Sequence, residues 1–120
     1  MDFATILTFF KTILLFSSNT AAPIIEYNAA LKETLSLKAG TSLILLVDIL
    51  GQPIPVVGWF CGEEAVTAGQ PGVTVEGDGT FSRLTIKGVG SKNAGRYTVV
   101  AENKVGSSSA AFNVVIKGEI

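Results

Sequence analysis

The sequence predicts an all-β fold in which two sheets pack face to face around a single core. Short runs of alternating apolar residues follow one another between turns rich in glycine and proline, as the strands of a sandwich do. Trp59, the only tryptophan, lies twelve residues after Val47, and Tyr97 lies two residues before Val99. A buried Trp beside two facing core positions, with a corner Tyr before the second of them, is typical of a two-sheet Greek-key sandwich.

The first predicted strands lead up to a loop that contains two prolines. We expect a short edge strand at residues 23–26, and its continuation after a break at residues 33–37. A longer strand follows at residues 42–49, because apolar side chains alternate there with period two. The prolines of residues 53–55 interrupt strand pairing before the next strand, at residues 56–61. The side chains expected to face inward are Leu43, Leu45, Val47, Ile49, Val57 and Trp59.

The remaining predicted strands are separated by short glycine-containing turns. Strands at residues 72–76 and 81–87 are joined by the tight turn at residues 77–79, whose sequence is Gly-Asp-Gly. The corner and the strand after it occupy residues 93–103, and the last strand occupies residues 110–116. Their inward side chains are expected to be Leu84, Ile86, Tyr97, Val99, Ala101, Ala110, Phe112, Val114 and Ile116.

Five motifs carry a resemblance to a known family over residues 23–117. The motifs are A-G-x-S from Ala39, G-x-P-x-P from Gly51, the residue Trp59, L-x-I from Leu84, and G-x-Y-T-x-x-A-x-N-x-x-G from Gly95. In this combination the chain resembles an immunoglobulin domain of the intermediate (I) set, which implies an immunoglobulin-like Greek-key β-sandwich. The core positions that the resemblance singles out are Val47, Trp59, Leu84, Tyr97 and Val99.

The two positions that are cysteine in most of this family are Val47 and Val99 here, so packing alone must join the sheets. Because a secreted sandwich usually keeps its disulfide, this substitution indicates a cytoplasmic setting. Together with the A-E-N-K-V-G run from Ala101, it makes the chain similar to domains of intracellular muscle proteins such as titin, twitchin, obscurin and myosin-binding protein C. The resemblance implies a sarcomeric module that links or docks other proteins.

Composition argues against nucleic-acid binding and against catalysis. A net charge of −1 provides no basic face for phosphates. The chain has no histidine to serve as a base, and its single cysteine cannot build a zinc site. The turn carboxylates lack the spacing of a calcium loop. We therefore expect no enzyme activity, no cofactor or metal, and no small-molecule substrate.

Residues 1–22 differ from the domain at residues 23–120, and we interpret them as a hydrophobic N-terminal helix with a linker. A secretory signal is an alternative that would make the protein a secreted or cell-surface recognition domain, but Asp2 and Lys11 depart from the pattern of such a signal. A membrane anchor is disfavoured because the polar stripe of the helix is not basic. We expect this helix to pack on the domain itself or on a second copy. Its apolar residues recur at helical spacing: Phe3, Ile6, Leu7, Phe10, Ile13 and Leu14.

One predicted sheet has an unusually apolar outer face, which we call the C–F–G face after the strand letters of the family. Single exposed apolar residues are normal on a protein surface, whereas a contiguous apolar patch usually marks an interface. We favour an interface because three strands contribute to this patch. The partner is expected to be the N-terminal helix, a second copy or another protein domain. The residues of the C–F–G face are Val56, Gly58, Phe60, Thr98, Val100, Ala111 and Val115.

The outer face of the other sheet is expected to be more polar. Ile44 and Leu46 point outward there, but they neighbour Arg83, Thr85 and Lys87. The sequence therefore predicts a non-catalytic structural or protein-binding immunoglobulin-like module of the muscle type. Because the helical segment is unusual for the family, a designed derivative, in which the helix covers the C–F–G face, is an alternative origin.

Overall fold

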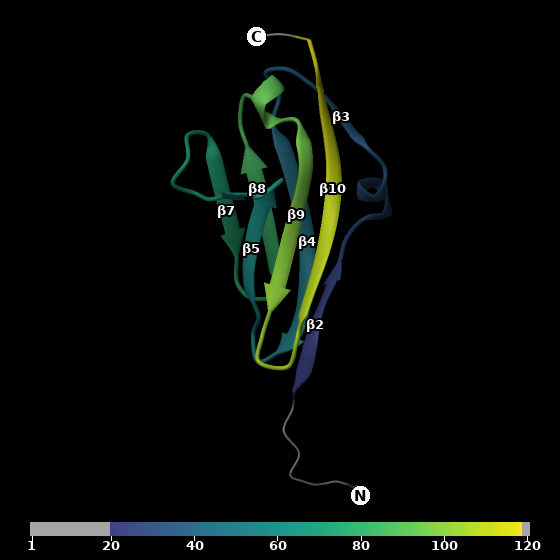
Figure 1. Ribbon diagram of the computed structural model, residues 1–120, viewed down its shortest axis with the longest axis vertical. Helices are drawn as coiled ribbons and strands as arrows, with labels where there is room; N and C mark the ends of the chain where they lie inside the picture. Colours follow the sequence, from purple (N-terminus) through teal and green to yellow (C-terminus); the bar gives the residue numbers. More distant parts are fainter. Residues whose placement is uncertain (1–19, 119–120) are drawn as a thin grey trace, which may run out of the picture.

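Two sheets of five and four strands form the molecule, which confirms the predicted all-β sandwich (Figure 1). The computed structural model describes residues 20–118, so the expected N-terminal helix lies outside the described residues. The five-stranded sheet has the order β3–β10–β9–β5–β6, and the four-stranded sheet has the order β2–β4–β8–β7. The strands are β2 (Ala21–Glu26), β3 (Leu35–Lys38), β4 (Leu43–Gln52), β5 (Val56–Cys61), β6 (Glu64–Val66), β7 (Val73–Gly77), β8 (Phe81–Ile86), β9 (Gly95–Glu102) and β10 (Ser107–Lys117).

The helices within residues 20–118 are two short 3-10 turns, η1 (Ala29–Lys32) and η2 (Ser91–Asn93). No helix of this part of the chain is long and apolar enough to cross a membrane. Asn28 caps η1, because its side-chain oxygen accepts a hydrogen bond of 2.8 Å from the backbone N–H of Ala30.

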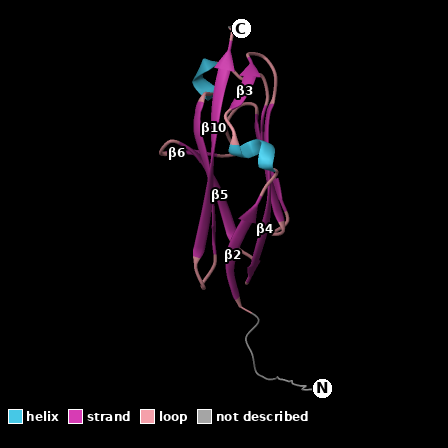
Figure 2. Ribbon diagram, turned by 90° about the vertical axis from the view of Figure 1, so that its right-hand side faces the viewer, coloured by secondary structure: helices cyan, strands magenta, loops and turns pink. Residues whose placement is uncertain are grey.

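The first edge strand is divided between the two sheets, as Figure 2 shows. Its first part, β2, pairs antiparallel with β4, whereas its second part, β3, pairs parallel with β10. The turn η1 lies between the two parts and carries the chain from one sheet to the other. This division places residues 20–26 beside β4 at one end of the sandwich and gives both sheets a closing edge strand.

One strand of the four-stranded sheet is longer than predicted, and one strand of the other sheet was not predicted at all. β4 runs to Gln52, beyond the expected end at residue 49, because Gln52 finds a pairing partner in Ala21 of β2. β6 was not predicted, because three residues are too few to display a period-two pattern. β6 extends the five-stranded sheet by pairing Ala65 with Phe60 of β5.

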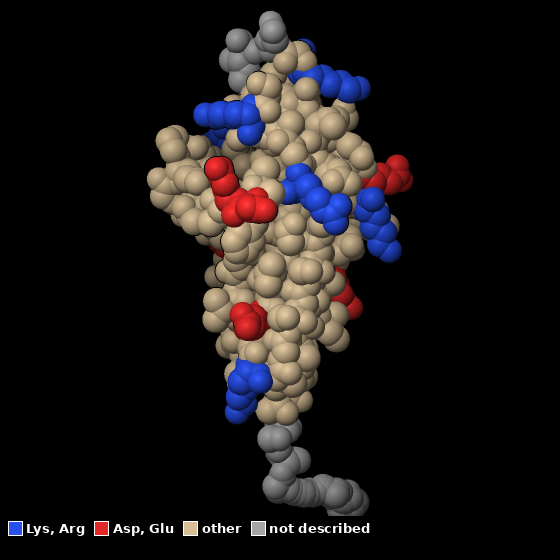
Figure 3. Space-filling view, viewed as in Figure 1, with Lys and Arg blue, Asp and Glu red and all other residues tan. Residues whose placement is uncertain are grey.

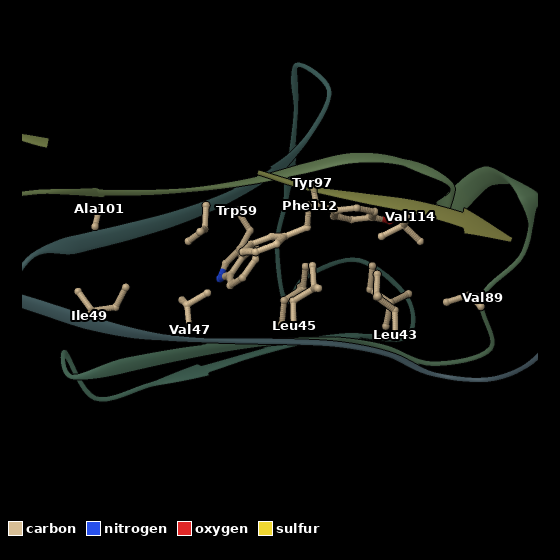
Figure 4. Close-up of a cluster of buried hydrophobic side chains, with 13 residues drawn as sticks. Leu43, Leu45, Val47, Ile49, Trp59, Val89, Tyr97, Ala101, Phe112 and Val114 are labelled. Atoms are coloured by element: carbon tan, nitrogen blue, oxygen red, sulfur yellow. The ribbon is translucent and has the colours of Figure 1, made fainter. Parts of the chain in front are cut away.

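The core lies between the sheets, where side chains of β4 face Trp59, Tyr97 and Phe112 of the opposite sheet (Figure 4). Val47 and Val99 are 1% and 0% exposed, so aliphatic side chains occupy the positions where most relatives would form a disulfide. The indole N–H of Trp59 donates a hydrogen bond of 2.9 Å to the hydroxyl of Ser82, which is also buried. The sheets are therefore joined by apolar packing and by one buried polar contact at the tryptophan.

The corner before β9 is organised by Tyr97. Its hydroxyl donates a hydrogen bond of 2.6 Å to the backbone carbonyl of Asn93, and the Asn93 side chain accepts a bond of 2.8 Å from the N–H of Gly90. Burial, together with the neighbouring Cys61, raises the pKa of Tyr97 to about 12. The phenol therefore stays neutral near physiological pH and serves as a hydrogen-bond donor that closes the corner.

Candidate protein-binding face

Strand pairing brings the outward side chains of β5, β9 and β10 into rows across the sheet. Phe60 lies opposite Thr98, which lies opposite Ala111 on the next strand. The adjacent row joins Gly58 to Val100 and then to Ser109. Because the rows are consecutive, the centre of the C–F–G face is continuous rather than scattered.

The exposure of these side chains increases toward one end of the face. Val56, in the row next to Gly58, is 78% exposed, whereas Gly58, Phe60, Thr98, Val100 and Ala111 are half-buried by their neighbours. Uncharged surface covers the middle of this side of the molecule, and charged side chains lie scattered around it (Figure 3). The arrangement offers a flat apolar surface that is suited to van der Waals contact with another protein.

Val115 does not join this surface. It lies farther along β10 opposite Ser36, and the polar row of Asn113 and Arg96 separates it from Ala111. The structure therefore brings six of the seven predicted face residues together and places Val115, which is 42% exposed, apart from them.

Gly58 keeps the centre of the face flat. A methyl group added at this position would meet only the ring of Phe60, at 3.5 Å, within the described residues. This is an ordinary van der Waals contact, so the packing of the domain itself does not require a glycine at this position. The missing side chain instead leaves the backbone of β5 open to close approach by a partner.

Ser107 and Ser109 also belong to the face, although neither was predicted to do so. Expected to begin at residue 110, β10 begins at Ser107 and so brings both serines into the rows of β9. Serine is a weak strand signal. The preceding strand, however, was predicted to include Val100 and Glu102, and in a hairpin those residues need partners just after the turn. The two hydroxyls supply hydrogen-bonding groups at the margin of the apolar centre.

Two loops that carry exposed apolar side chains meet at the end of the domain where β2 begins. Asn103 joins three segments there, because its amide donates to the carbonyl of Ala21 at 2.8 Å and to that of Pro53 at 3.0 Å. Ile54 and Val105, which are 63% and 46% exposed, come from the two loops that meet at this end.

The outer face of the four-stranded sheet is more apolar than the sequence analysis expected. Four large aliphatic side chains of β2 and β4 are between 46% and 56% exposed: Ile24, Ile44, Leu46 and Leu50. Arg83 and Thr85 lie opposite Leu46 and Ile44, as predicted, but the aliphatic row continues beyond them. The run L-I-L-L-V-D-I-L in β4 already carried this signal, because a strand with one solvated face alternates more strictly.

The described residues hold no group of three or more Cys, Asp or Glu side chains that could bind a metal ion. Their one ion pair joins Arg83 to Glu76 on the four-stranded sheet. The geometry thus supports apolar and hydrogen-bonded contact with a macromolecule.

Comparison with known proteins agrees with this geometry. Residues 28–116 match the model of the Immunoglobulin I-set domain. The chain belongs to the immunoglobulin I-set family. Among its I-set relatives, Neuronal growth regulator 1 of Gallus gallus is 40% identical over 62 residues, which are 52% of this chain and 18% of the relative. Myosin-binding protein C, fast-type, of Gallus gallus is 32% identical over 85 residues, which are 71% of this chain and 8% of the relative.

The I-set domain also superposes on solved muscle structures. The crystal structure of the titin domains z1z2 in complex with telethonin matches with a TM-score of 0.75 and 26% identity, over 85% of this chain and 51% of that chain. Sequence and structure thus both show that the chain is similar to I-set domains of the muscle type. The chain spans less than a fifth of the two curated relatives, which are far longer proteins.

Proposed function

We propose that this I-set domain is a non-catalytic structural and docking module of the muscle type, and that it binds a protein partner through the C–F–G face. The observation that carries this proposal is the continuous apolar centre formed by paired residues of β5, β9 and β10. A solvated sheet face normally carries polar side chains in such rows. The similarity to titin domains that were crystallised in complex with telethonin supports binding to a protein. Telethonin itself is the partner of those titin domains.

Val56, at one end of the face, and Gly58, near its centre, are expected to contact the partner. Complete burial of one valine side chain contributes about 1.5–3 kcal/mol, so Val56 gains most from a partner because it is the most exposed. Gly58 allows a partner backbone to approach β5, and Ser109, on the far side of Val100 in the same row, can donate or accept a hydrogen bond. Apolar contact therefore supplies the affinity, and the hydroxyls of Ser107 and Ser109 add orientation.

The test is affinity capture from muscle extract with quantitative mass spectrometry, using the domain and two arginine variants as bait. Gly58→Arg places a charge in the centre of the face without a backbone clash, and Thr85→Arg is the matched control on the opposite sheet. We expect Gly58→Arg to lose partners that the domain and Thr85→Arg retain. Equal recovery of the same proteins by all three baits would refute the proposed face.

We further propose a cytoplasmic, sarcomeric location. The support comes from relatives named for muscle and from the two valines at the usual cysteine positions. The similarity to Neuronal growth regulator 1 favours the second candidate, a secreted or cell-surface recognition domain. N-terminal sequencing after expression in secreting cells separates the two, because removal of residues 1–22 would support the second candidate.

The helix expected in residues 1–22, and its packing on the C–F–G face, stay predictions because they lie outside the described residues.

A further inference from the structure

The outer face of β2 and β4 combines aliphatic pairs with an acidic pair. Ile24 lies opposite Leu50, and Glu26 lies opposite Asp48 in the next outward row. Leu46 and Ile44 continue the same side of β4, so aliphatic surface lies on both sides of the carboxylates. We call these six residues the β2–β4 stripe. Figure 2 shows the two strands side by side below the short helix η1.

The acidic pair has no compensating cation in the part of the chain that the structure describes. Like charges directly opposite each other on one face of a sheet destabilise it. Arg83, the nearest cation in register on this face, forms its ion pair with Glu76 of β7 rather than with Asp48. A cation placed between Glu26 and Asp48 would remove this repulsion, while an apolar segment beside it would cover the aliphatic residues.

A shallow groove marks the far end of the stripe. Its volume is about 550 Å³, and it lies between β4 and the segment around η1. Tyr27 and Leu31 line one side, and Ile44, Leu46 and Asp48 line the other. The groove is wide enough for a large apolar side chain that approaches along β4.

The chain itself contains a segment with the complementary pattern. Residues 3–16 are mainly apolar, and Lys11 is the only basic residue before Lys32. As a helix, these residues would extend about 21 Å, and the distance along β4 from Leu50 to Ile44 is about 20 Å. Lys11 would lie about 7.5 Å from the end of the helix at Phe16, and Asp48 lies about 6.6 Å along β4 from Leu50.

The connection is also short enough. Only residues 17–20 separate Phe16 from Ala21, where β2 begins, and Ala21 pairs with Gln52 at the same end of β4 as Leu50. Four residues span at most about 14 Å. If the chain reverses direction before β2, residues 3–16 must therefore lie on a surface close to the start of β2. The β2–β4 stripe begins within three residues of this point.

We propose that residues 3–16 dock on the β2–β4 stripe, with the Lys11 ammonium between the carboxylates of Glu26 and Asp48. The C–F–G face fits this segment less well, because its outward positions on β9 include both Arg96 and Glu102. The stripe instead presents two carboxylates to one ammonium. Docking there leaves the C–F–G face free for a separate partner.

The test is zero-length carbodiimide cross-linking of the full chain, followed by peptide mass spectrometry. A mixture of unlabelled and ¹⁵N-labelled protein distinguishes cross-links within one chain from those between chains. We expect an intramolecular amide between Lys11 and Asp48 or Glu26. Lys11→Arg is the matched control, since it keeps the charge but cannot form this amide. A cross-link from Lys11 to Glu102, a cross-link only between chains, or none at all would overturn the proposal.

A charge exchange provides a second readout that does not depend on the cross-linking reaction. Chymotrypsin cleavage after the phenylalanines of residues 3–16 should accelerate in Lys11→Glu. Cleavage should slow again when Lys11→Glu is combined with Glu26→Lys and Asp48→Lys, because the exchanged charges attract once more. Absence of this rescue, with the sandwich intact by circular dichroism, would contradict the proposal. Neither readout depends on partner binding at Gly58, so the two proposals can fail separately.

Discussion

The hydrogen bond between Trp59 and Ser82 makes the clearest prediction about stability. Ser82→Ala removes the acceptor of the indole N–H, and both residues lie in the interior, at 2% and 4% exposure. A buried donor left without a partner costs about 1–3 kcal/mol. We therefore expect Ser82→Ala to lower the free energy of unfolding by about 2 kcal/mol, a large share of the roughly 5–15 kcal/mol that domains typically have.

Urea unfolding followed by circular dichroism measures this change, and thermal unfolding should show a lower Tm. For a domain of this size, about 2 kcal/mol corresponds to a shift of roughly 8–16 °C. Ser109→Ala, on the exposed face of β10, is the matched control and should change stability by less than about 0.5 kcal/mol. In a Trp59→Phe background the donor is absent, so Ser82→Ala should cost much less than in the parent chain.

This reasoning would be refuted if Ser82→Ala lowered the free energy of unfolding no more than Ser109→Ala does. It would mean that the indole N–H finds another partner when the hydroxyl is removed, and that the contact does not join the sheets. Equal costs for Ser82→Ala in the parent chain and in the Trp59→Phe background would lead to the same conclusion, because the coupling energy would be zero.

Three further predictions concern the core, the corner and a turn. Val99→Ala deletes two buried methyl groups and leaves a cavity, so it should lower the free energy of unfolding in urea by about 2–3 kcal/mol. A change below about 0.5 kcal/mol would show that packing at this position does not replace the disulfide. Because the folded pKa of Tyr97 is about 12, above its ordinary value of 10.0, the unfolded chain releases this proton first, and stability should fall as pH rises from 10 to 12. Tyr97→Phe should make that decline shallower, and an identical pH profile for both proteins would contradict the assignment. Gly77→Ala should destabilise by about 1–3 kcal/mol, since its methyl group would approach the backbone oxygen of Phe81 to 2.6 Å, whereas Gly58→Ala meets only ordinary contacts and should change Tm little.

The absence of a disulfide shifts the stability of this I-set domain onto side-chain packing. Loss of a native disulfide from a small secreted domain typically costs about 2–5 kcal/mol. Here the interior around Val47 and Val99 is closed by large side chains, with Trp59 and Phe112 in a tilted arrangement at a centroid distance of 6.4 Å. Tyr27 adds an edge-to-face contact with Phe112 at 5.0 Å. Aromatic pairs of this kind contribute about 0.5–1.5 kcal/mol beyond the area that they bury.

The inward-facing positions of this chain could be predicted from the sequence because they depend on a local rule. Side chains alternate between the two faces of any strand, so the position of one buried residue determines the others in the same strand. Leu43, Leu45, Val47 and Ile49 follow this rule, and all four are buried in β4. Trp59 and Tyr97 then identified the architecture, because each needs an apolar site with one polar partner.

The composition of the outer faces could be predicted only in part, because it depends on pairing between strands that are distant in the sequence. Ser109 belongs to the C–F–G face because β10 pairs in register with β9, and Val115 is excluded because it pairs with β3. The meeting of Glu26 with Asp48, and of Ile24 with Leu50, requires the antiparallel register of β2 on β4. The sequence by itself thus determined most of the buried strand positions, through periodicity and hydrophobicity, whereas the burial of Ser82 and Val89 was not predicted. Only the tertiary structure decided which exposed side chains become neighbours, because hydrogen bonding between strands sets their register.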